Sequence, residues 1–325
     1  KNKRLTLGAL GAALAISTVT VAHAASSQAA KAAMTSAPTA DAKTSVRGTH
    51  AVSSRQPVTI RFTATQGTRP IRCGTALTGV GTTDASTRLK DMRFYVSNVR
   101  LVRRNGTSVK VKLRRDDQWN LTRGSQSVTL IDLENGRGGC TGDARMNTIV
   151  VGTVPRGTYA GITYTVGVPL ALNHTNPTAT PAPLNLLALN WSWQAGRKFT
   201  QIELVRPTTG KVVGPDFLVH LGSTGCQGVP TGRNAMSCTA PNRAKGLFRS
   251  FDPARQRIAL DLDAMTARID VTRNRGGAAG CMSGTTDPEC GGIFRAAGLH
   301  WSADGRGTGR TVGDGTRQRL FRVIG

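Results

Sequence analysis

The stretch VTIRFTA, residues 58–64, is the first part of the chain whose pattern decides a fold class. Apolar and polar side chains alternate along it, and a period of two residues is typical of a β-strand with one buried face. Similar short segments, rich in β-branched residues and bounded by Gly, Asn, Asp or Pro, recur along the chain. They span residues 92–102, 108–113, 128–133, 148–154, 159–166, 199–205, 217–221 and 257–262.

Helical patterns are scarce by comparison. One short helix is predicted near residues 261–268, and residues 184–193 fit either a strand or a helix. No regular alternation of strands with helices is visible, which argues against the parallel-sheet classes. The 38 glycines and 14 prolines among 325 residues indicate many turns and loops. We therefore predict an all-β fold, a single β-sandwich-like domain with long loops braced by disulfides.

The beginning of the chain has the pattern of a secretory leader. Three basic residues precede an apolar stretch over residues 5–21, and Ala22-His23-Ala24 forms an A-x-A cleavage signal. No later run of about 18 apolar residues occurs, so no membrane span is expected and the location is periplasmic or secreted. The predicted organisation is a signal peptide over 1–24, a flexible Ala/Ser/Thr-rich tether over 25–55 and a folded domain over 56–325.

The chain is strongly basic, with a formal net charge of +25. Such a balance would suggest nucleic acid in a cytoplasmic protein, but the leader directs this chain elsewhere and no nucleic acid is expected. The densest basic run, residues 110–115, alternates like the solvated face of a strand. A docking surface for an acidic partner or an anionic cell envelope is the alternative interpretation.

The six cysteines all follow the leader. An even number in an oxidising compartment predicts three disulfides. Proximity in sequence favours Cys226–Cys238 and Cys281–Cys290 and leaves Cys73–Cys140, although other pairings stay open. A thiolate metal site is the alternative, but the chain has no C-x2-C spacing.

Familiar catalytic motifs are missing from the sequence. There is no H-E-x-x-H, no G-x-S-x-G and no phosphate-binding glycine loop, so ordinary hydrolase and nucleotide-dependent functions have no support. Histidines that could bind a ligand are His174, at the start of a proline-rich loop, and His220, at the end of an apolar run. A lone histidine of this kind is more often a satisfied core residue than a ligand.

The unusual feature is NWSWQAG, residues 190–196. In an extended segment the indoles of Trp191 and Trp193 share one face, as in a core aromatic pair or a platform for stacking sugars. An indole nitrogen only donates hydrogen bonds and cannot bind a metal. If the ring is opened oxidatively to kynurenine, an arylamine lone pair appears, and two neutral imidazoles beside it would suit copper.

Six segments together resemble the MbnP-like copper-binding proteins. This group is also called the metallo-mystery pair four-Cys motif family and is associated with methanobactin operons. The segments are DMRFYVSNVRLV (91–102), LIDLENGRGGC (130–140), GVPLALNH (167–174), PLNLLALNWSWQAGRKF (183–199), FLVHLGSTGC (217–226) and CMSGTTDPEC (281–290). The resemblance extends from about residue 58 to the C-terminal end.

The resemblance implies a periplasmic copper-binding protein, not an enzyme, paired with a MauG-like di-haem cytochrome c peroxidase. That partner would oxidise a tryptophan of the W-x-W motif to kynurenine and so complete the copper site. By position Trp191 matches the modified residue, with Trp193 as the alternative, and His174 and His220 match the copper ligands. Met282 could add a soft thioether, although packing beside a disulfide is the simpler interpretation.

Two departures from the family pattern are visible. Arg197 stands where we expect an aromatic residue, and we expect it to alter the surface around the site. Six cysteines in place of four imply one additional disulfide. Two other functions stay open: a carbohydrate-binding β-sandwich that uses Trp191 and Trp193 as a stacking platform, and an envelope protein that binds anionic polymers.

Overall fold

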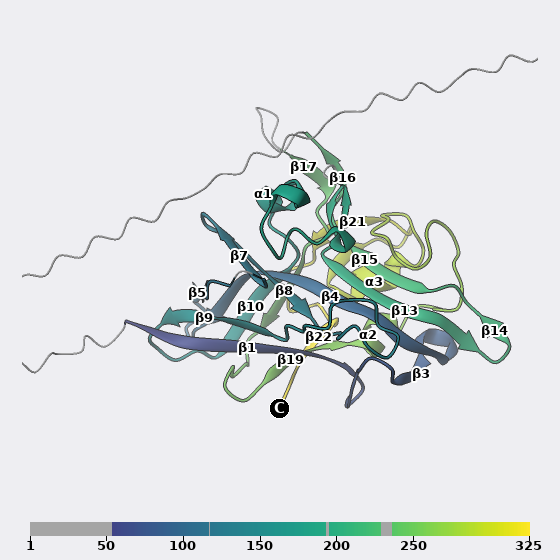
Figure 1. Cartoon of the computed structure of the whole chain (residues 1–325), viewed down its shortest axis with the longest axis horizontal. Coiled ribbons are helices and arrows are strands. Elements are labelled where there is room, and N and C mark those ends of the chain that lie inside the picture. The colour runs from purple at the N-terminus through teal and green to yellow at the C-terminus, as the bar shows by residue number, and fades with distance from the viewer. Residues whose placement is uncertain (1–53, 117, 193–194, 229–235) are drawn as a thin grey trace, which may run out of the picture. The chain divides into compact units, whose positions relative to one another are not determined.

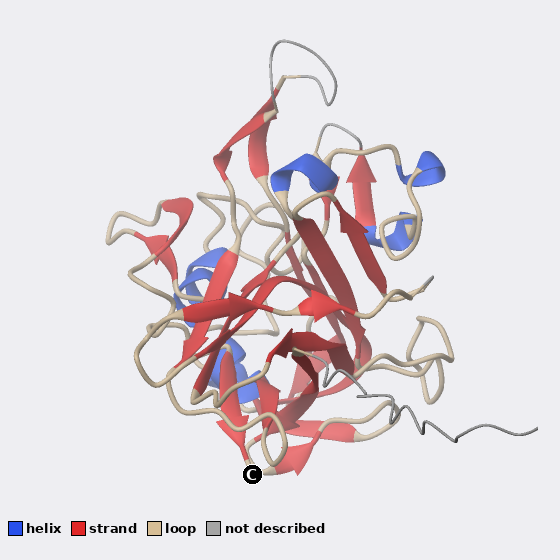
Figure 2. Ribbon diagram, turned by 90° about the vertical axis from the view of Figure 1, so that its left-hand side faces the viewer, coloured by secondary structure: helices blue, strands red, loops and turns tan. Residues whose placement is uncertain are grey.

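Two β-sheets packed face to face enclose the main core (Figures 1 and 2). The computed structural model describes residues 54–325 except 117, 193–194 and 229–235. The predicted leader and nearly all of the predicted tether lie outside the described residues. No helix in the described part is long and apolar enough to cross a membrane.

Six strands form the first sheet and ten form the second. The first consists of β1 (Arg55–Gln66), β2 (Arg69–Pro70), β6 (Lys112–Leu113), β9 (Ile149–Pro155), β19 (Arg257–Asp261) and β22 (Phe321–Ile324). The second consists of β3 (Ala76–Val80), β4 (Ala85–Val102), β5 (Ser108–Lys110), β7 (Asn120–Arg123), β8 (Gln126–Asp132), β10 (Gly161–Val166), β13 (Thr200–Thr209), β14 (Val212–Val213), β15 (Phe217–Leu221) and β18 (Ala244–Phe248). Every predicted strand segment overlaps an observed strand, although 108–113 divides into β5 and β6, which belong to different sheets. The predicted all-β sandwich is confirmed.

The main core lies between the two sheets and consists of the side chains that point inward from each of them. Phe62 of β1 and Phe94 of β4 pack edge to face across the sandwich, with ring centroids 5.8 Å apart. Tyr164 and Phe321 extend this aromatic cluster with further edge-to-face contacts. Because strand side chains alternate, the residues between these core positions face the other side of each sheet.

The outer side of the ten-stranded sheet is also covered. Tyr95 of β4, which follows Phe94 and therefore points away from the main core, is fully buried in a second apolar cluster. Its other members include Leu172, Leu184 and Phe199 from the segment that connects β10 with β13. In Figure 1, α1 (Leu170–Asn173) lies on the side of β4 away from β1.

Short elements complete the described chain. Three two-stranded sheets are formed by β11 (Asn190–Ser192) with β12 (Gly196–Arg197), β16 (Thr224–Gln227) with β17 (Ser237–Ala240), and β20 (Leu299–Trp301) with β21 (Gly307–Thr311). The 3-10 helices are η1 (Gly81–Thr83), η2 (Pro177–Ala179) and η3 (Leu187–Leu189). The described part of the ambiguous stretch, residues 184–192, thus consists of a turn, the 3-10 helix η3 and the strand β11.

The sequence prediction is incomplete for the helices and for several strands, among them β3, β18 and β22. The predicted helix is present as α2 (Leu262–Thr266), and the Asp261 carboxylate caps it by accepting a hydrogen bond from the Ala264 N–H at 3.1 Å. The structure adds α1 and α3 (Cys290–Ala296). The glycine pair in α3 lowers its helix propensity, but a Cβ on Gly292 would lie 2.6 Å from Ile269. Close packing therefore explains the glycine and outweighs propensity.

All three predicted disulfides are present. Cys73–Cys140, Cys226–Cys238 and Cys281–Cys290 account for the six cysteines, and none is free. The second disulfide links β16 to β17 within one hairpin, and the third ties the loop that carries Met282 to the start of α3. The prediction of disulfide-braced loops is confirmed.

Candidate metal centre

The segment between β10 and β13, residues 167–199, carries three of the candidate site residues, of which His174 and Trp191 are described by the structure. Its apolar side chains pack on the outer face of the ten-stranded sheet around Tyr95. The Tyr95 hydroxyl donates a hydrogen bond to the Pro183 carbonyl at 2.8 Å. This segment, which we call the cover segment, is therefore attached to the sheet by both apolar and polar contacts.

Arg197 holds the cover segment together from the inside. Its guanidinium is fully buried and donates five hydrogen bonds of 2.7–3.0 Å to backbone carbonyls. The acceptors belong to Leu172, Asn173, Thr175 and Leu184. Burial lowers the pKa of Arg197 to about 10, so the side chain stays charged at neutral pH.

The expectation that Arg197 alters the surface around the site is wrong, because the side chain points inward. A guanidinium has five N–H donors in a fixed fork, and five hydrogen bonds offset the cost of removing its charge from water.

His174 follows α1 directly and is only 2% exposed. The Asn173 side-chain oxygen accepts the backbone N–H of Arg197 at 2.9 Å, which orients its amide nitrogen toward His174 Nε2 at 3.0 Å. Gly196 has a φ of 79°, and a Cβ there would lie 2.5 Å from the same amide nitrogen. The glycine of the NWSWQAG motif is therefore needed for the contact that positions His174.

His220 projects from β15 toward the outer face of the sheet. Its neighbours Val219 and Leu221 point into the main core, so alternation turns the imidazole the other way. The side chain is 4% exposed, and its Nε2 lies 2.8 Å from Glu203 Oε1 on β13. The Nδ1 atom is buried and has no hydrogen-bond partner among the described residues.

Glu203 accepts a hydrogen bond from His220 and so determines which ring nitrogen bears a proton. Burial alone would raise the pKa of Glu203, but hydrogen bonds from His220 and from Lys90 outweigh burial and lower the pKa to about 2. Lys90 Nζ lies 3.2 Å from Glu203 Oε2 and 3.0 Å from Asp216. An ionised carboxylate only accepts hydrogen bonds, so Nε2 bears a proton, and in the neutral form of the ring the unpartnered Nδ1 carries the lone pair.

Trp191 and Met282 line the same open cavity, which has a volume of about 620 Å³. Both side chains are half-buried, and Cys226 contributes to the same wall. The Trp191 ring packs on Gly222, where a Cβ would lie 2.5 Å from the indole Cζ3 atom. Gly222 follows His220 by two residues, which links the indole to the β15 side of the site. Trp193 lies outside the described residues.

These contacts bring the candidate residues to neighbouring positions without closing them into one cluster. His174 Nε2 lies 3.6 Å from Cys238 Sγ, whose disulfide partner Cys226 lines the cavity. Neither His174 nor His220 is among the described residues that line the cavity beside Trp191.

Side chains that could bind a metal ion come together at two places in the described chain. Two groups of three His, Cys or acidic residues have ligand atoms within 4.8 Å of one another. They are His174 with Cys226 and Cys238, and Glu134 with Cys73 and Cys140. His220 is in neither group, and its nearest acidic contact is Glu203.

Sequence reasoning missed Glu203 and Asn173. Glu203 lies between Ile202 and Leu204, which both enter the main core, so the sequence signals that its side chain faces outward. The pairing with His220 depends on the register of β13 against β15, in which Gln201 is opposite His220 and Glu203 is its diagonal neighbour. Nothing local in the sequence specifies that register.

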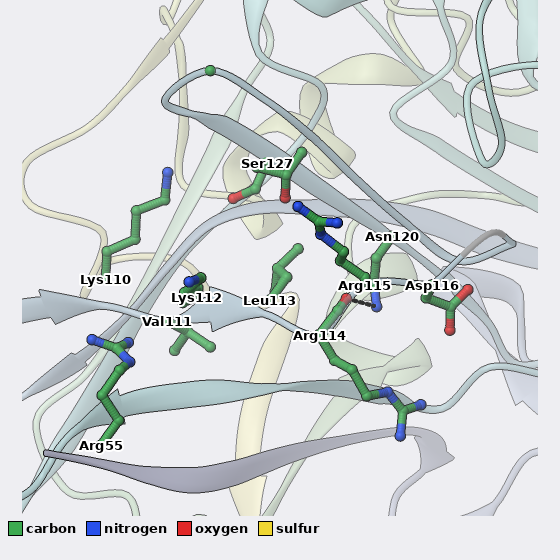
Figure 3. A pocket seen from close by; sticks show the side chains of 12 residues that line it. Arg55, Lys110, Val111, Lys112, Leu113, Arg114, Arg115, Asp116, Asn120 and Ser127 are labelled. Carbon is green, nitrogen blue, oxygen red and sulfur yellow. Dashed lines mark hydrogen bonds between the residues drawn. The ribbon is translucent and has the colours of Figure 1, made fainter. Parts of the chain in front are cut away.

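The basic run identified in the sequence lines a different cavity, of about 630 Å³, between β5, β6 and the β7–β8 hairpin. Figure 3 shows Lys110, Lys112 and Arg115 around it, with Arg114 directed away from the hairpin. Lys112 and Arg114 are exposed and Val111 is buried, as the predicted alternation requires, but Arg115 is exposed as well, so the alternation ends at Arg114. None of the candidate copper ligands lines this cavity.

A disulfide-braced β-sandwich with a histidine–carboxylate pair on one outer face is the class that the fold and site define. The profile of the MbnP family matches residues 55–283, so the chain belongs to that family. Among solved structures it is similar to MbnP from Methylosinus trichosporium, with 33% identity and a TM-score of 0.72. That match covers 83% of this chain and 98% of the other. The comparison with curated proteins finds no match.

The role of Arg197 can be tested by Arg197→Lys. A lysine has three donors in place of five and lacks the planar fork, so buried carbonyls lose their partners. We expect the free energy of unfolding, measured by urea denaturation, to fall by about 2–4 kcal/mol. The matched control is Arg114→Lys at an exposed position, which should change it by less than about 0.5 kcal/mol. Equal effects of the two substitutions would contradict the assignment.

Proposed function

We propose that this protein is an exported, periplasmic copper-binding protein and not an enzyme, whose site is completed by oxidation of Trp191 to kynurenine. The oxidant is a partner protein, a MauG-like di-haem cytochrome c peroxidase. Membership of the MbnP family supports this assignment. Three disulfides, which are typical of proteins in oxidising compartments, support the export.

The buried Nδ1 atom of His220 is the observation that carries the proposal. A buried polar atom without a partner costs free energy, and a ligand that accepts its lone pair would remove that cost. Histidines that bind metals commonly donate their other ring N–H to a carboxylate, which fixes the tautomer. The 2.8 Å contact between His220 and Glu203 has this arrangement.

The chemistry of the neighbouring side chains fits copper. His174 would supply a second imidazole, Met282 offers a thioether, and kynurenine at position 191 would add an arylamine. Nitrogen and sulfur donors without a formal charge suit copper, whereas calcium and magnesium select oxygen ligands. Copper bound there would be the cargo of the protein.

Trp191 is placed so that a partner protein could oxidise it. It is half-buried and lines an open cavity, so an edge of the indole remains accessible. In that oxidation the indole C2–C3 bond would break and two oxygen atoms would be added, a four-electron oxidation for which the partner would reduce two equivalents of hydrogen peroxide to water. Hydrolysis then releases C2 as formate and leaves the arylamine of kynurenine.

Co-expression with the di-haem partner tests this proposal. Protein produced alone should keep an intact indole and bind copper weakly, because an indole nitrogen offers no lone pair. Protein produced with the partner should show, by peptide mass spectrometry, a residue 191 with one carbon fewer and one oxygen more. Copper titration against a competing chelator should then reveal tight binding.

Two tryptophan variants provide the comparison. Trp191→Phe should lose both the modification and the tight binding, whereas Trp301→Phe, at another half-buried tryptophan, should keep both. Modification at Trp193 alone would show that the assignment to Trp191 is wrong. If Trp191→Phe binds copper normally but loses affinity for an oligosaccharide, the carbohydrate-binding alternative is correct.

The Glu203 carboxylate should matter for copper affinity, because it accepts a hydrogen bond from His220 Nε2 and so leaves Nδ1 as the nitrogen that can bind copper. Glu203→Leu removes the acceptor, and we expect copper affinity to fall by about 10- to 100-fold in chelator competition. Glu203→Gln keeps an oxygen acceptor and should retain most of the affinity. Asp216→Asn is the matched control, since Asp216 contacts Lys90 but has no recorded contact with His220. A loss in Asp216→Asn as large as in Glu203→Leu would argue against a direct role.

A further inference from the structure

The Cys226–Cys238 disulfide differs from the other two in its surroundings. Cys281 and Cys290 are fully buried, and Cys140 is 8% exposed beside a half-buried Cys73, whereas Cys226 and Cys238 are both half-buried. Cys226 also lines the open cavity of about 620 Å³ that Trp191 shares. Attack on a disulfide requires access to one of its sulfur atoms, and this disulfide has two half-buried cysteines, one of which faces an open cavity, so we expect a dissolved thiol to attack it first.

An imidazole lies directly beside this disulfide. His174 Nε2 is 3.6 Å from Cys238 Sγ, and one ligand atom from each of His174, Cys226 and Cys238 fits within 4.8 Å. While the disulfide is intact its sulfur atoms are poor ligands, because metals bind cysteine as the thiolate. Reduction would therefore turn an existing cluster into one nitrogen and two thiolate donors.

The rest of the fold can tolerate this change. Cys226 and Cys238 face each other across β16 and β17, which pair only with each other in the described chain. Opening the disulfide leaves the hydrogen-bond ladders of both main sheets intact. His174 is positioned separately by Asn173 and Arg197, so the imidazole would stay in place when the sulfur atoms are released.

We propose that two-electron reduction of the Cys226–Cys238 disulfide opens a second metal site, which binds a soft ion such as Cu(I) or Cd(II) through His174 and both thiolates. A dithiol reductant supplies two electrons and two protons and becomes a cyclic disulfide. Metal binding then displaces the two thiol protons. Soft thiolates select such ions over hard cations. This inference goes beyond the proposed function, because the second site needs neither His220 nor a modified Trp191.

The experiment begins with limited reduction of the full chain under anaerobic conditions by a dithiol, which is then removed by gel filtration. Alkylation and peptide mass spectrometry should find two free thiols, at Cys226 and Cys238. Titration with Cd(II) should give one ion per chain with a thiolate-to-metal ultraviolet absorption band. Equal labelling of the buried cysteines, or two thiols at the expected positions without Cd(II) binding, would overturn the proposal.

Variants separate the two sites and control for folding. Cys226→Ser combined with Cys238→Ser should abolish the absorption band, and His174→Ala should weaken Cd(II) binding by about tenfold or more. The double variant Cys73→Ser and Cys140→Ser loses an equal number of cysteines and should keep the band. Unchanged binding in His174→Ala would contradict the assignment of that ligand.

The proposed function can fail independently of this site. Trp191→Phe and His220→Ala keep all six cysteines, so both should retain Cd(II) binding after reduction. If reduction-dependent binding disappears in His220→Ala while circular dichroism shows an intact fold, the second site is not separate and the inference is wrong.

Discussion

The five hydrogen bonds from the buried Arg197 guanidinium are the constraint on which the candidate site depends. They draw together the carbonyls of residues 172, 173 and 175, around the end of α1, and the carbonyl of Leu184, in the middle of the loop that leads to β11. The same residue offers its backbone N–H to Asn173, whose amide reaches His174. One buried cation thus fixes the cover segment and orients one of the two candidate imidazoles.

The two imidazoles are held in different ways. His220 belongs to a strand of the ten-stranded sheet, and its orientation follows from strand alternation and from Glu203 on the neighbouring strand. His174 and Trp191 belong to the cover segment, and their positions depend on Arg197 and on the close approaches that Gly196 and Gly222 allow. A site built from a sheet and a separate covering segment can be completed by changing one side chain without altering the core.

Much of the fold was predictable because strand alternation, turn residues and cysteine proximity are local signals. The helix α3 was not predictable, because its two glycines lower the helix propensity. Only the structure shows that Gly292 packs closely against Ile269. The burial of Arg197 could not be predicted, because its hydrogen-bond partners are backbone carbonyls and no side-chain pattern in the sequence identifies them. Glu203 faces outward by a local pattern, but its contact with His220 depends on strand register. The identities of His174, His220 and Trp191 as ligands came from family resemblance.

The most direct test of the account is an anomalous diffraction map, measured at the copper absorption edge, of the copper-loaded protein produced with the proposed di-haem partner. The account predicts one copper peak in contact with His220 Nδ1, His174 and a kynurenine at position 191, with Glu203 still bonded to Nε2. A peak at the Cys226–Cys238 sulfur atoms or at the basic cavity, with residue 191 an intact tryptophan, would contradict it.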